Sequence, residues 1–208
     1  MINLSKGGRI NLSKESNNGL EKLFFGSNWG AIQRKGFLGL GSSIEKVDLD
    51  SSVLMYDADK HCIGEVAYYN LRASGIRHSG DDRSGDINGN DGLDNETIEV
   101  HLNELDPRVE YLAFILNNFT HQRFGEIPYM GLRIYTADRV QTNVNANVNV
   151  LAKFNLEDGK EGTKIADKQA VVLGIAYKKD GEWRFKAVGE FGGCTSIDAM
   201  KRPTIAFF

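Results

Sequence analysis

An apolar–polar alternation with a period of two residues recurs in short segments along the whole chain. Successive side chains of a β-strand point to opposite faces of a sheet, so this period predicts strands that bury one face. The predicted strands are residues 23–29, 47–56, 63–69, 97–102, 111–117, 131–136, 144–154, 170–178 and 183–188. Helix signals are confined to residues 103–109 and 196–201. We therefore predict a mainly β fold, an antiparallel β-sandwich with few short helices.

Turn residues predict two hairpins within this fold. Asp180 and Gly181 supply the positive-φ positions of a tight turn between the last two predicted strands. At the start of the chain one alternating tetrapeptide occurs twice, at residues 2–5 and 10–13, with two glycines between the copies. This repeat predicts a second strand–turn–strand unit.

Length, charge and cysteine content limit the classes of protein to which the chain can belong. With 208 residues, 41% of them hydrophobic, the chain can fill a core, and we expect residues 1–208 to form a single domain. The formal net charge is -3 and the basic residues are scattered, which argues against nucleic acid as a partner. No apolar run is long enough to span a membrane and the start lacks the layout of an export signal, so we expect a cytoplasmic protein. We expect Cys62 and Cys194 to be reduced thiols there.

The strongest functional signal is an acidic, glycine-rich segment at residues 80–96. Its carboxylates are Asp81, Asp82, Asp86, Asp91, Asp94 and Glu96, and its amides are Asn88, Asn90 and Asn95. Only one cation, Arg83, lies among them, and the segment has few apolar side chains to bury. Crowded carboxylates repel one another, so this segment is expected to fold around a divalent cation. Many oxygen ligands favour Ca²⁺, with Mg²⁺ as an alternative.

A second acidic element lies on the predicted strand 47–56. Asp48 and Asp50 are two residues apart, so they share one face of the strand, about 6.5 Å from each other, while Val47 and Leu49 enter the core. A rigid strand and a flexible acidic loop together make a plausible metal site. Equally, the two carboxylates could simply face water on an exposed sheet.

Other metal sites fit the sequence poorly. In an EF-hand register that starts at Asp86, Asp91 takes the place of the glycine and Thr97 the place of the bidentate glutamate. Zinc is disfavoured because the local ligands are all oxygens and the histidines are dispersed.

An enzyme is the alternative class of function. The chain carries no nucleophile elbow, no phosphate-binding loop and no His-Glu-x-x-His sequence. His78 precedes the acidic segment and could act as the general base of a metal-dependent hydrolase that uses the same acids. The other interpretation is that His78 is a polar surface residue at the end of a strand.

Several short motifs, in a fixed order over most of the chain, resemble the TerD family of tellurium-resistance and stress-response proteins. They lie at residues 4–8, 12–14, 26–29, 48–51, 68–70, 80–85, 124–125 and 181–189. The segment Gly-Asp-Asp-Arg-Ser-Gly at residues 80–85 is the most specific of them. The acidic loop departs from the usual family pattern at Ile87 and at Gly92-Leu93, where the family is more compactly acidic.

The resemblance implies a calcium-binding β-sandwich without catalytic activity, encoded among bacterial genes for resistance to tellurite and other chemical stress. The metal ligands that it implies are Asp48, Asp50, Asp81, Asp82 and Asp86, with further acids at Asp91, Asp94 and Glu96. We expect the calcium-loaded surface to bind other proteins of a tellurite or stress-resistance complex, membrane-associated proteins being one class of candidate. The rival hypothesis is the metal-dependent hydrolase.

Overall fold

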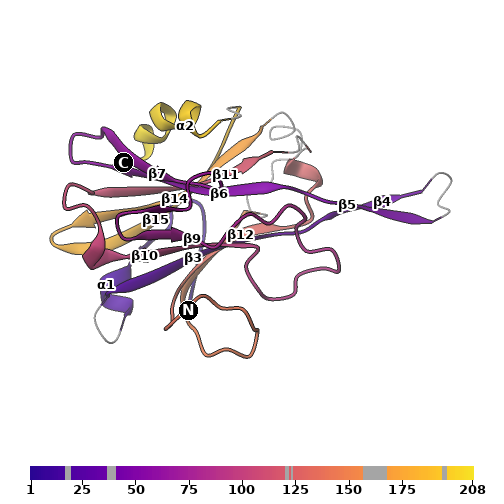
Figure 1. Cartoon of the computed structure of the whole chain (residues 1–208), viewed down its shortest axis with the longest axis horizontal. Helices are drawn as coiled ribbons and strands as arrows, with labels where there is room; N and C mark the ends of the chain where they lie inside the picture. Colours follow the sequence, from indigo (N-terminus) through magenta and orange to yellow (C-terminus); the bar gives the residue numbers. More distant parts are fainter. Residues whose placement is uncertain (17–19, 37–40, 120–121, 123, 157–167, 194–195) are drawn as a thin grey trace.

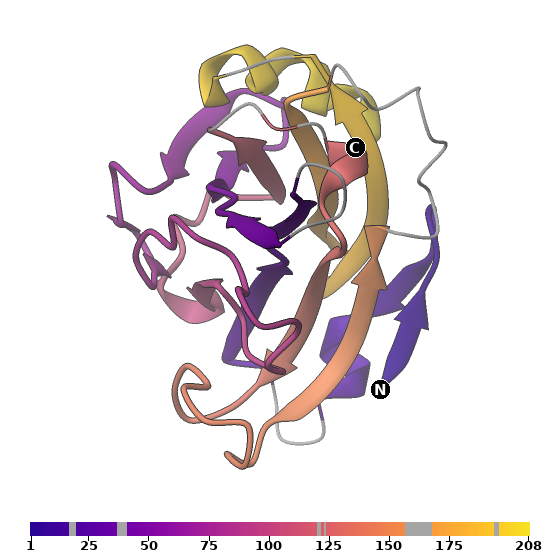
Figure 2. The ribbon, with the colours of Figure 1, turned by 90° about the vertical axis from the view of Figure 1, so that its right-hand side faces the viewer.

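The computed structural model describes residues 1–16, 20–36, 41–119, 122, 124–156, 168–193 and 196–208. Thirteen of the described strands form two β-sheets that face each other as the two layers of a sandwich (Figures 1 and 2). The seven-stranded sheet has the order β1 (Ile2–Leu4), β13 (Asn149–Asn155), β12 (Met130–Thr136), β3 (Lys22–Trp29), β10 (Glu96–His101), β9 (Ile76–His78), β8 (Arg72–Ala73). The six-stranded sheet has the order β2 (Arg9–Asn11), β15 (Glu182–Gly192), β14 (Ala170–Lys179), β11 (Tyr111–Asn118), β6 (Leu49–Tyr56), β7 (Cys62–Val66). The mainly β fold is therefore confirmed.

The remaining elements are short. Strands β4 (Ile32–Lys35) and β5 (Ser42–Glu45) form a hairpin that projects beyond one end of the sandwich (Figure 1). The helices are α1 (Leu12–Glu15), α2 (Ile197–Thr204) and the 3-10 turns η2 (Leu102–Glu104), η3 (Phe124–Glu126) and η6 (Ile205–Phe207). No helix in the described ranges combines the length and apolar character needed to cross a bilayer.

The core lies between the sheets and is built from the apolar residues of the two-residue period. Phe25 of β3 stacks on Phe114 of β11 across the interface, with ring centroids 3.9 Å apart, and Phe185 of β15 lies 6.1 Å from Phe25. A second apolar cluster covers the outer face of the six-stranded sheet, where Ile197 and Met200 of α2 are buried. Both faces of this sheet are therefore covered over much of its area.

The predicted hairpin at the start of the chain is wrong. β1 pairs with β13 in the seven-stranded sheet, and in parallel, whereas β2 pairs with β15 in the six-stranded sheet. Gly7, at φ 82, turns the chain, and its amide donates to the Ala187 carbonyl of β15 at 2.9 Å. The two glycines thus carry the chain from one layer to the other, and residue 12 already begins α1.

Other boundaries also differ from the sequence prediction. β13 begins at Asn149 rather than residue 144, because Asn143 accepts a hydrogen bond from the Asn145 amide and closes a turn instead. Residues 103–109 contain only the end of η2. The hairpin turn at Asp180 (φ 55) and Gly181 (φ 76) is confirmed.

Candidate metal centre

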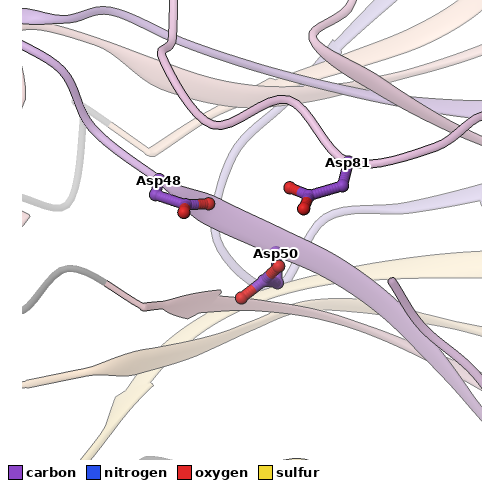
Figure 3. A group of neighbouring side chains, drawn as sticks. All are labelled: Asp48, Asp50 and Asp81. Carbon is purple, nitrogen blue, oxygen red and sulfur yellow. The ribbon is translucent and has the colours of Figure 1, made fainter. Parts of the chain in front are cut away.

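Three carboxylates converge at the start of strand β6. Asp48 and Asp50 flank Leu49, and Asp81 approaches from the loop that follows β9 (Figure 3). One oxygen from each carboxylate lies within 4.8 Å of the other two. As predicted, Val47 and Leu49 are fully buried in the core, so the alternation turns both aspartates towards the opposite face. Asp48 and Asp50 are nevertheless only 5% exposed.

Backbone hydrogen bonds hold the acidic loop against this strand. The Val47 amide donates to the Ser84 carbonyl at 3.1 Å, and the Asp86 amide donates to the Trp29 carbonyl at 3.0 Å. The Trp29 indole, itself fully buried, donates to the Val47 carbonyl at 2.9 Å. Gly85 packs against the Trp29 indole and has a φ of 66. A Cβ atom at this position would be only 2.7 Å from Trp29 Cδ1. The loop and the strand are therefore positioned by one shared tryptophan.

Asp82 stabilises the turn of the loop. One of its oxygens accepts hydrogen bonds from the Ser84 amide at 2.9 Å, the Ser84 hydroxyl at 2.8 Å and the Gly85 amide at 3.2 Å. The other oxygen accepts from the Asn95 side chain at 3.1 Å. Burial acts to raise the pKa of Asp82, but these hydrogen bonds outweigh it, and the pKa is lowered. Asp82 is therefore an ionised turn-stabilising residue in this arrangement.

Three further acids of the loop are bonded away from the cluster. Asp86 accepts hydrogen bonds from the Tyr129 hydroxyl at 2.5 Å and from Asn95 at 3.1 Å. Asp94 forms a two-pronged ion pair with Arg133 of β12, at 2.5 and 2.9 Å. Asp91 is exposed and accepts a hydrogen bond from the Leu93 amide at 2.8 Å.

Glu96 and His78 lie inside the sandwich, next to the cluster. The Glu96 carboxylate is fully buried and accepts hydrogen bonds from the Ser51 amide at 2.6 Å and the Asp82 amide at 3.1 Å. His78 Nε2 lies 3.0 Å from the Ser51 carbonyl and 3.4 Å from Glu96. The interpretation of His78 as a surface residue is wrong, because β9 pairs with β10 and turns the imidazole inward.

Burial and crowding disfavour negative charge at the cluster. Desolvation, followed by the charges of Glu96, Asp48 and Asp81, raises the pKa of Asp50 to about 7. Desolvation and the charge of Asp81 also raise the pKa of Asp48. Arg83 offers partial compensation, since its Nε lies 3.7 Å from Asp48 and 3.9 Å from Asp81. Its side chain is 74% exposed, however, so solvent screens its effect. The cluster is short of positive charge.

Asn117 is a polar residue at this site that the sequence analysis missed. It lies directly opposite Asp50 in the pairing of β11 with β6, and is 4% exposed. Within the described part of the chain, neither its amide nitrogen nor its amide oxygen has a hydrogen-bond partner. The available signal was an amide in the otherwise apolar strand 111–117.

Asp50 and Asn117 also line a cavity of about 190 Å³. Its rim carries three exposed aromatic residues, Tyr68, Tyr69 and Phe119, and Tyr68 contacts each of the other two edge to face. The Phe119 amide donates to the Asp48 carbonyl at 3.0 Å, which ties this rim to the acidic cluster. Aromatic and acidic groups therefore share one surface.

Comparison with known proteins places the chain in a family. The TerD domain matches residues 1–200. The chain is 30% identical to the tellurium resistance protein TerZ of Serratia marcescens, over 99% of this chain and 98% of that protein. It is 31% identical to the stress response protein SCP2 of Bacillus subtilis (strain 168), over 95% and 96%.

A solved homologue of the telluride resistance protein from Streptomyces coelicolor A3(2) has the same fold. It superposes with a TM-score of 0.58 at 17% identity, over 88% of this chain and 95% of that one. The ordered motifs, the two-layered sheet architecture and the match over residues 1–200 agree. The chain belongs to the TerD domain family.

Proposed function

We propose that this protein is a non-enzymatic calcium-binding protein of the stress response, which binds partner proteins through the surface around the ion. The observation that carries the proposal is the convergence of Asp48, Asp50 and Asp81 within 4.8 Å, with two of the three carboxylates buried. Its relatives are named tellurium resistance and stress response proteins.

The residues present fit Ca²⁺. This ion takes six to eight oxygen ligands at about 2.3–2.6 Å, so oxygens on opposite sides of it lie about 5 Å apart. One oxygen from each of the three carboxylates lies within 4.8 Å of the other two, so the cluster is compact enough to surround such an ion. Carboxylates from a strand and a loop would hold the ion between them, and the amide oxygen of Asn117 offers a neutral ligand from β11. A bound cation would offset the desolvation and the repulsion that raise the pKa of Asp50.

The structure gives the hydrolase alternative little support. A hydrolase at this site would need a base that reaches the solvent side of the ion. The His78 side chain is fully buried, its Nε2 faces the Ser51 carbonyl and its Nδ1 accepts a hydrogen bond from the Gly80 amide at 3.1 Å. Both ring nitrogens are thus engaged within the fold.

The aromatic rim of Tyr68, Tyr69 and Phe119 supports the binding of a partner protein. Tyr69 is 56% exposed and Phe119 is 54% exposed, beside the proposed ion. Exposed aromatic residues next to polar groups are typical of protein–protein contact sites. We assign the partners to a tellurite or stress-resistance complex, with membrane-associated proteins as one class. We also propose a cytoplasmic location, which the free thiol of Cys62 supports; Cys194 lies outside the described residues.

Calcium titration by calorimetry, after treatment with EGTA, tests the metal site. We expect Asp50→Asn to bind calcium at least tenfold more weakly than the parent, because it removes a charged ligand from a buried cluster. Asp91→Asn is the matched control, since Asp91 is exposed and bonded within its own turn, and it should leave the affinity unchanged. Equal affinities for the parent and Asp50→Asn would contradict the proposed site.

The partner surface requires its own test. Cross-linking in cells should capture a partner with the calcium-loaded parent and lose it both in EGTA and with Tyr69→Ser. Tyr177→Ser, on another part of the six-stranded sheet, is the control. Capture that is indifferent to both calcium and Tyr69 would contradict a metal-dependent docking surface.

A further inference from the structure

We propose that a second site, on the outer face of the six-stranded sheet, binds a small anion that carries a planar ring, such as an aryl phosphate or carboxylate. The site is a cavity of about 400 Å³. Its lining includes four cations, Arg9, Lys178, Lys179 and Lys186, and three aromatic residues, Tyr111, Tyr177 and Phe208.

The strand register places two of these cations directly opposite each other. Arg9 of β2 pairs with Lys186 of β15, and Lys186 pairs with Ile175 of β14. Directly opposite residues of antiparallel strands point to the same face, and like charges in such a pair destabilise a sheet. A negative partner would relieve this repulsion.

Within the described ranges, no carboxylate forms an ion pair with Arg9, Lys179 or Lys186. Lys186 donates a hydrogen bond to the neutral Phe207 carbonyl at 3.1 Å. A similar pair, Arg72 opposite Arg77, differs because Glu104 lies 3.8 Å from Arg77.

Of the carboxylates near the cavity, one pairs with the lining residue Lys178 and two pair with Arg184. Glu110 lies 3.7 Å from Lys178, while Asp180 and Glu182 lie 3.3 and 3.4 Å from Arg184. The cavity is thus a basic site on a protein whose formal net charge is -3. Anions are attracted to such a concave basic surface.

The aromatic wall of the cavity is fixed by its own packing. Phe208 stacks on Tyr111 with ring centroids 4.5 Å apart and an interplanar angle of 8°, and meets Tyr56 edge to face at 4.7 Å. Tyr177 is the strand partner of Tyr111. Flat apolar surfaces beside cations favour a ligand with a ring as well as a charge.

This site is separate from the acidic cluster. Tyr111 and Asn117 lie towards opposite ends of β11, about 20 Å apart at the usual rise per residue. The anion site therefore does not depend on calcium, and its failure would leave the proposed metal centre untouched.

Phenyl phosphate is the probe for a calorimetric and NMR titration, and inorganic phosphate and phenol are titrated separately for comparison. We expect phenyl phosphate to bind at least tenfold more tightly than either of these two ligands, and to shift the signals of Tyr111 and Tyr177. Arg9→Gln and Lys186→Met should each weaken binding at least fivefold, and thermal melting should show that both variants are folded. Arg72→Gln is the control and should bind as the parent does.

The proposal is overturned by absence of phenyl phosphate binding, by equal binding of phenyl phosphate and either inorganic phosphate or phenol, or by unchanged affinity in Arg9→Gln and Lys186→Met.

Discussion

Asp50 is a carboxylate in a place that disfavours its charge. Its side chain is buried, three other acids surround it, and its pKa is raised to about 7 from 3.8. In the calcium-free protein the folded state therefore holds a proton at Asp50 that the unfolded state has already lost, between about pH 4 and pH 7. A raised carboxylate pKa means that stability falls as the pH rises through this window.

This fall in stability with rising pH gives a prediction for Asp50→Asn in EGTA. The variant lacks the titrating group, so its free energy of unfolding relative to the parent should increase from pH 5 to pH 8. Urea denaturation of both proteins at the two pH values measures the difference. Asp91→Asn, at an exposed position, should show no such trend. If the difference in free energy of unfolding between Asp50→Asn and the parent were the same at both pH values, the fold would not disfavour the charged form of Asp50.

The sequence predicted the position of Asp50 because the two-residue period fixes the face of a strand. The same reasoning could not tell which acids of the loop lie in the cluster and which bond to other parts of the fold. Asp94 bonds to Arg133 and Asp86 bonds to Tyr129. Arg133 lies in β12 and Tyr129 directly precedes this strand, which reaches the loop only because it pairs with β3. The spacing of residues along the chain does not encode these long-range contacts. Asn117 was missed for the same reason, since its importance lies in its cross-strand neighbour.

At the scale of elements, the acidic loop depends on Gly85. This residue is buried at φ 66, so a side chain there is strained by the backbone and also meets the Trp29 ring. We predict that Gly85→Ala destabilises the protein by about 2 kcal/mol or more. Gly89→Ala is the matched control, because its φ is 88 but its Cβ would meet nothing within 4 Å. Its cost should be about 1 kcal/mol, from the backbone alone.

Thermal or urea denaturation compares the two alanine variants. Equal losses of stability would mean that the close contact between the new Cβ atom of Gly85→Ala and Trp29 costs nothing. A loss confined to Gly85→Ala would instead show that the positive φ is relaxed in the variant at Gly89.

Strand β12 holds the loop through the pair of Arg133 with Asp94, whose side chains are 13% and 2% exposed. Burial raises the pKa of Asp94 even against the opposing effect of Arg133. We predict that Arg133→Met destabilises the protein by about 3 kcal/mol, because it leaves a buried carboxylate without its counter-charge. Adding Asp94→Asn should recover much of this loss in urea denaturation. A single variant as stable as the parent would contradict the role of the pair.

The alternation also predicted the strands better than their connections. Strands of the core were predictable because burial on one face imposes a regular pattern, as in β11 and β15. The partners of β1 and β2 were not, because the repeat in residues 2–13 says nothing about which distant strands offer an open edge.

For the whole molecule, calcium should act as a stabilising ligand. A ligand bound only by the folded state adds about 2.7 kcal/mol at a hundredfold excess over its Kd. For a protein of 208 residues this corresponds to a rise in melting temperature of about 5–10 °C. Mg²⁺ should raise it less, because it retains its water ligands. A melting temperature that is the same in EGTA and in calcium would contradict the metal site.

The first eleven residues belong to both layers of the sandwich: Ile2 pairs with Ala152, and Ile10 pairs with Phe185. The partner strands β13 and β15 follow β1 and β2 by well over a hundred residues, so neither of these two sheet edges can form from local contacts. Closing both edges is therefore expected to be a slow step of folding, as is typical of long-range β pairing.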